Sequence, residues 1–88
     1  MCLAHLRPAP QVFTLAAERL GVPASRCAVV EDALAGIAAA QAAGMASIGL
    51  ASTGRRHEEL AAADLVVNRL DELTPEIVRD LIRQRAVG

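Results

Sequence analysis

The stretch CAVVEDALAGIAAAQAAG occupies residues 27–44 and decides the fold. It opens with four apolar residues, 27–30, a run typical of a short strand that is buried on both faces of a parallel sheet. The acidic pair Glu31 and Asp32 ends this run, and an alanine-rich segment follows over 33–43. This order predicts a strand that leads directly into a helix, with Asp32 as the helix cap and Gly44 as its end.

The same alternation continues on both sides of this stretch. Further elements are predicted at residues 8–20 (helix), 45–50 (strand), 56–62 (helix), 64–67 (strand) and from Thr74 onward (helix). Strands and helices that alternate at this spacing form right-handed crossovers around a parallel sheet. The sequence therefore predicts an α/β fold with three layers, a Rossmann-like partial parallel sheet of about three strands with flanking helices.

Length and composition predict one small domain over residues 1–88. A chain of 88 residues buries only ~60–65% of the surface of its unfolded state, so its stability is marginal. Hydrophobic residues make up 53% of the chain, yet Phe13 is its one aromatic residue. The core must therefore consist of Ala, Val, Leu and Ile, which suits closely packed layers of helix on sheet.

The balance of charge excludes several classes of partner. The chain has nine arginines and ten acidic residues, with a net charge of −1, so the basic face of a nucleic-acid-binding protein is not expected.

A membrane span and a secreted protein are not expected either. Residues 33–54 carry no charge, but Gly44 and the Ala-rich composition predict two short elements there, and no membrane span. The first residues lack a secretion signal and Cys2 and Cys27 make no disulfide framework, so we expect a cytoplasmic protein.

Glu31 and Asp32 are the candidate functional residues. Ligands of open parallel sheets bind beyond the carboxyl ends of the strands, where this pair is expected. Two adjacent carboxylates can bind Mg²⁺ directly or orient its water ligands. The alternative interpretation is structural, with Asp32 as a helix cap and Glu31 as a favourable charge near the helix amino end.

Several motifs occur in a fixed order along the chain. They are Arg7-Pro-Ala-Pro, Ala16-Ala-Glu-Arg-Leu-Gly-Val, Val30-Glu-Asp-Ala-Leu-Ala-Gly-Ile, Ala42-Ala-Gly-Met and Ile48-Gly. From about Leu6 to Leu73 the chain resembles the haloacid dehalogenase superfamily, specifically its β-phosphoglucomutase-like phosphatases and mutases. The resemblance implies a Mg²⁺-dependent enzyme that transfers phosphoryl groups of small phosphorylated metabolites through an aspartyl-phosphate.

The resemblance also implies roles for particular residues. Glu31 and Asp32 match the acidic pair that binds magnesium in this family. Arg7 takes the place of a basic residue, usually Lys, that neutralises the transferring phosphoryl group. Arg keeps the positive charge but presents it as a planar fork.

The family's nucleophile motif, Asp-x-Asp, does not occur in these 88 residues. Covalent catalysis needs its nucleophile, so we expect the carboxyl-terminal half of such an enzyme, inactive alone and with weak or absent Mg²⁺ binding. Without the other half, strand 27–30 would expose an unpaired edge. That edge predicts a homo-oligomer, or docking onto the missing amino-terminal half. The alternative function is a non-catalytic α/β module that acts through self-association or a partner chain.

Overall fold

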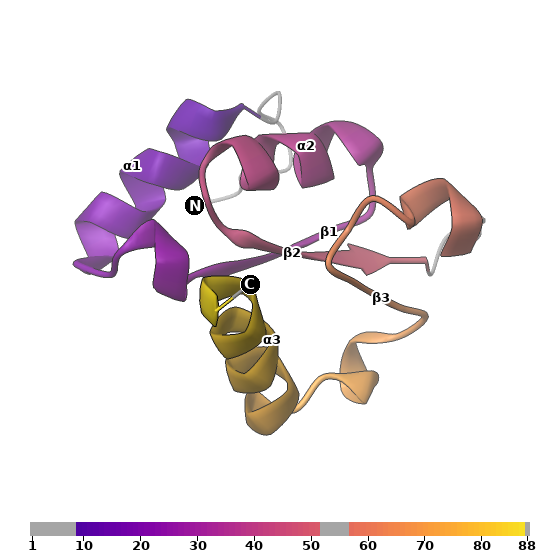
Figure 1. Ribbon diagram of the computed structural model, residues 1–88. Helices are drawn as coiled ribbons and strands as arrows, with labels where there is room; N and C mark the ends of the chain where they lie inside the picture. The colour runs from indigo at the N-terminus through magenta and orange to yellow at the C-terminus, as the bar shows by residue number, and fades with distance from the viewer. Residues whose placement is uncertain (1–8, 52–56, 88) are drawn as a thin grey trace.

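The computed structural model describes residues 9–51 and 57–87, which form a three-layer α/β arrangement (Figure 1). Its elements are α1 (Pro10–Leu20), β1 (Ala28–Glu31), α2 (Leu34–Ala42), β2 (Ala46–Leu50), β3 (Leu65–Val67) and α3 (Pro75–Val87). The three strands are parallel and lie in the order β1-β2-β3. Helices α1 and α2 lie on one face of the sheet and α3 on the other (Figure 1). The predicted fold class is confirmed.

The register of the sheet brings the carboxyl ends of its strands to one edge. Glu31 of β1 lies opposite Gly49 of β2, and Leu50 of β2 lies opposite Val67 of β3. Each strand is followed by a segment that leaves the sheet at this edge, because a parallel neighbour can be reached only through a crossover. Side chains that follow the strands are therefore the ones available for a shared site.

The end of α1 and the start of α3 follow from local chemistry. Gly21 ends α1 with a φ of 70°, in the left-handed region that glycine adopts without steric cost. At the start of α3, the Thr74 side-chain oxygen accepts a hydrogen bond from the N–H of Ile77 at 3.1 Å. Pro75 occupies the first helical position, where an N–H group would have no partner within the helix, so its absence costs no hydrogen bond.

Two predictions about helices are wrong in detail. The backbone stays extended through Ala33 (φ −123°, ψ 144°), so Ala33 is the N-cap of α2 and Asp32 lies one residue too early to cap it. The cap position makes no side-chain hydrogen bond. The helix predicted at 56–62 is instead a short 3-10 helix at His57–Leu60, and residue 56 lies outside the described residues.

The core is small, and among residues 9–51 and 57–87 it contains one buried polar residue. Ile37, Ile48 and Leu60 are its largest fully buried apolar side chains, and Ser47 is 1% exposed. The Ser47 hydroxyl accepts a bond from the N–H of Asp64 at 3.1 Å, and the Ser47 N–H donates to Asp64 Oδ2 at 2.8 Å. Because a buried serine without partners would cost stability, this reciprocal pairing fixes β2 against the segment that enters β3.

The helices are short. The longest, α3, has 13 residues, against the ~20 apolar residues needed to cross a bilayer. Across residues 9–51 and 57–87, no helix has both the length and the apolar content of a membrane span.

Candidate functional site

The acidic pair lies at the carboxyl end of the sheet, as predicted. Glu31 is the last residue of β1, and Asp32 follows it in the bend that leads to α2. The two side chains differ in environment: Glu31 is half-buried, whereas Asp32 is exposed. The pair thus combines a carboxylate that is held by the fold with one that faces solvent.

Glu31 is seated over the first turn of α2. Its side chain lies so close to Gly36 that a Cβ atom on residue 36 would overlap Glu31 Cγ and Cδ. Gly36 is itself buried. The N–H of Asp32 donates a hydrogen bond to Glu31 Oε1 at 3.1 Å. Glycine at position 36 therefore makes room for the Glu31 carboxylate, and the backbone bond orients it.

Gly36 belongs to the motif that starts at Val30, but its role was not predicted. A signal for this role was present, since a glycine inside a helix costs about 1 kcal/mol relative to alanine and calls for a packing reason. The distance between Glu31 and Gly36 in three dimensions could not be read from the sequence.

The electrostatics of the pair favour a cation. Burial raises the pKa of Glu31 above its ordinary value, and the hydrogen bond and charge of the Asp32 carboxyl group raise it further. The backbone N–H groups of Asp32 and Ala33 oppose this rise. A half-buried carboxylate beside another carboxylate carries an energetic cost that a bound cation would remove.

The donor set fits part of a magnesium site. Mg²⁺ prefers oxygen ligands in an octahedron and usually keeps several waters, so two carboxylates from the protein are a common contribution. Within residues 9–51 and 57–87 there is no group of three or more His, Cys, Asp or Glu residues that could hold a metal. Asp32 is exposed and does not cap α2, so its carboxylate is available as a direct metal ligand. The Glu31 carboxylate is held by Gly36 and the Asp32 N–H, so fewer orientations are open to it as a ligand.

Arg7, the predicted partner of the phosphoryl group, lies outside the described residues. Its position relative to Glu31 and Asp32 thus stays a prediction.

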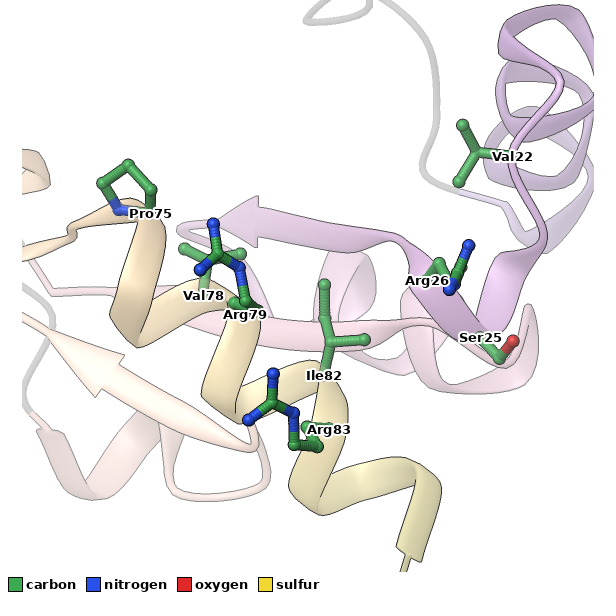
Figure 2. A pocket seen from close by; sticks show the side chains of 8 residues that line it. All are labelled: Val22, Ser25, Arg26, Pro75, Val78, Arg79, Ile82 and Arg83. Atoms are coloured by element: carbon green, nitrogen blue, oxygen red, sulfur yellow. The ribbon is translucent and has the colours of Figure 1, made fainter.

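A separate groove of about 920 Å³ lies between α3 and the segment that precedes β1 (Figure 2). Its lining combines apolar side chains, among them Val22, Val78 and Ile82, with the three arginines Arg26, Arg79 and Arg83. Sequence analysis missed this groove because its two walls are about fifty residues apart in the chain. The spacing of Arg79 and Arg83, one helical turn, was the available sign that they share a face.

Comparisons with known proteins converge on one family. A family model described as a haloacid dehalogenase-like hydrolase matches residues 3–44. The β-phosphoglucomutase of Bacillus subtilis is 38% identical over 78 residues, which cover 89% of this chain and 33% of that protein. Protein CbbY of Cereibacter sphaeroides is 38% identical over 71 residues, covering 81% of this chain and 31% of that protein.

A solved structure shows the same arrangement. The crystal structure of β-phosphoglucomutase from Clostridium difficile matches with a TM-score of 0.78 and 33% sequence identity, over 93% of this chain and 35% of that one. The chain therefore spans about a third of the length of these relatives.

Proposed function

This chain is a homologue of the haloacid dehalogenase-like hydrolases, and on that basis we propose that it carries the metal-binding part of a Mg²⁺-dependent phosphohydrolase or phosphomutase. The observation that carries the proposal is the acidic pair at the carboxyl end of β1, with Glu31 seated on Gly36 and Asp32 exposed. The matches to mutases and hydrolases support the reaction class.

The two carboxylates would hold the metal in different ways. Asp32 would supply a direct oxygen ligand, and Glu31 would either ligate the ion or orient one of its waters, because Glu31 Oε1 already accepts the Asp32 N–H. When bound, Mg²⁺ would neutralise charge on the phosphoryl group. Arg7 would add positive charge to the same group. The substrate class proposed is a small phosphorylated metabolite.

The 88 residues by themselves are proposed to lack turnover. They contain no Asp-x-Asp motif, so the attacking carboxylate must come from polypeptide outside this sequence. Positioning and charge neutralisation alone do not supply a covalent phosphoenzyme. In keeping with two carboxylates as its only proposed ligands, Mg²⁺ binding to the isolated chain is expected to be weak. The cytoplasmic location expected from the sequence also stays a prediction.

A Mg²⁺ titration followed by backbone amide chemical shifts tests the metal site. We expect shifts confined to Glu31, Asp32 and the start of α2, and their loss in the variant Asp32→Ala. Asp80→Ala is the matched control, since it removes an exposed carboxylate from α3 and should leave the shifts intact. Equal shifts at acidic residues over the whole surface would contradict the proposal.

A phosphatase assay with p-nitrophenyl phosphate tests the proposed inactivity. No turnover above the buffer rate is expected from the 88-residue chain in Mg²⁺. Turnover that survives stringent purification and disappears in Asp32→Ala would show that the chain is active by itself.

The second candidate function is a non-catalytic module that acts through association. It is favoured by one specific observation, the position of β1 at an edge of the sheet formed by the described residues.

A further inference from the structure

The carboxylate of Asp64 joins three elements of the fold. Its Oδ2 atom accepts hydrogen bonds from the N–H of Ser47 at 2.8 Å and from the Ser47 hydroxyl at 3.2 Å, both in β2. The same atom lies 3.8 Å from a guanidinium nitrogen of Arg85, in the last turn of α3. Asp64 itself comes immediately before β3. One oxygen atom therefore connects β2, α3 and the start of β3.

The bonds from Ser47 hold the Asp64 side chain in position for Arg85. Ser47 is 1% exposed, so the core fixes its place. The side chains of Arg85 and Asp64 are 32% and 27% exposed, and charges that are partly buried are screened by salt less than exposed ones. A cation in the last turn of a helix also interacts favourably with the helix dipole. The pair is thus an oriented contact between α3 and the sheet.

Helix α3 can leave the sheet without breaking a strand pairing. It lies on the opposite face of the sheet from α1 and α2 (Figure 1) and packs against β2. Its backbone hydrogen bonds are made within the helix, whereas the strand pairings join β1 to β2 and β2 to β3. The contacts that hold α3 in place include the ion pair and the half-buried side chains Val78, Leu81 and Ile82. Its detachment is therefore a smaller step than unfolding of the sheet, and it can occur as a local opening.

We propose that Asp64 is the electrostatic docking point of α3, and that Ser47 supports it by holding the carboxylate where Arg85 meets it. When this contact is broken, α3 detaches as a unit more often, and β1, β2 and β3 stay paired. Because α3 supplies one wall of the arginine-lined groove, its detachment also takes the groove apart (Figure 2). The proposal is independent of the metal site, since it involves neither Glu31 nor Asp32.

Native-state hydrogen exchange of backbone amides tests the detachment. After correction for intrinsic rates, amides in the middle of α3 should exchange about tenfold or more faster than the slowest amides of β2. R85Q removes the charge at nearly equal helix propensity and should accelerate the α3 amides a further two- to fivefold, roughly the effect of one partly exposed ion pair. R85K keeps the charge and should retain most of the slow exchange. R83Q is the matched control, because it removes a charge from the same turn of α3 and should not accelerate these amides.

Double variants test the roles of Asp64 and Ser47. D64N should accelerate the α3 amides by the same factor as R85Q, and D64N/R85Q by no more than either single change, because both remove the same contact. S47A should accelerate the α3 amides in the original chain and have no further effect on them beside R85Q.

Three results would each overturn the proposal. They are equal exchange rates in α3 and β2, an acceleration by R83Q that matches that of R85Q, and additive effects of D64N and R85Q. If S47A destabilises the sheet so far that all amides exchange together, the comparison of D64N, R85Q and their double variant still decides.

Discussion

Replacing Gly36 by alanine tests whether this glycine is needed to hold the Glu31 side chain in place, independently of its effect on the stability of α2. A Cβ at this position would overlap Glu31 Cγ and Cδ, so the Glu31 side chain must leave its place. Alanine adds about 1 kcal/mol of helix propensity. Against this, the displaced side chain loses its bond from the Asp32 N–H, worth about 0.5–1.5 kcal/mol, and leaves its rotamer at a cost of about 0.5–1.5 kcal/mol.

The two losses together come to about 1–3 kcal/mol and are partly offset by the gain, so Gly36→Ala should destabilise the chain by about 0–2 kcal/mol. The affinity for Mg²⁺ should fall by about tenfold or more, as is usual when the support of a metal-binding group is removed. Urea unfolding measures the first quantity, and amide shifts during a Mg²⁺ titration measure the second.

Ala38→Gly is the matched control for this experiment. Residue 38 lies on the exposed side of the same helix, so the change removes about 1 kcal/mol of helix propensity and leaves Glu31 in place. It should therefore lower stability with unchanged Mg²⁺ affinity. A folded Gly36→Ala chain that binds Mg²⁺ as tightly as the original would refute the role assigned to the glycine.

Two further predictions concern stability. Ser47→Ala removes the hydroxyl that accepts the Asp64 N–H and should lower the free energy of unfolding in urea by about 1–3 kcal/mol. The control Ser25→Ala, at an exposed position, should lower it by less than ~0.5 kcal/mol. Equal effects of the two changes would contradict the role of the buried pairing. The pKa of Glu31 is about 4.3 in the unfolded chain and is raised in the folded chain, so the folded chain holds this proton more tightly. In metal-free buffer, the free energy of unfolding should therefore fall as the pH rises from the unfolded-state pKa through the folded-state pKa. Glu31→Gln should flatten that part of the pH profile, and an unchanged slope would show that burial does not raise the pKa.

Much of the fold could be predicted because its signals are local. The apolar runs mark the three strands, Gly21 marks the end of α1, and Thr74 with Pro75 marks the start of α3. The predicted capping role of Asp32 was wrong because the chain remains extended for one more residue than the pattern indicates. Residue type identifies a good cap, but the backbone angles at Ala33 decide where the helix begins.

The candidate site was predictable in position and not in detail. An acidic pair after an apolar run is enough to place carboxylates at the carboxyl edge of a parallel sheet. The half-burial of Glu31 depends on its contact with Gly36 in the next element, and that contact exists only once α2 packs beside β1. The arginine-lined groove likewise requires α3 to cross beneath the segment before β1.

The strand order β1-β2-β3 has a consequence for how the chain folds. Each strand hydrogen-bonds to the strand that comes next in the sequence, and the intervening segments, residues 32–45 and 51–64, are equal in length. Closing such loops costs little entropy compared with sheets whose neighbouring strands are distant in sequence. Each of the two parallel pairings can therefore form by closing one crossover of 14 residues, without first bringing together strands that are more distant in sequence.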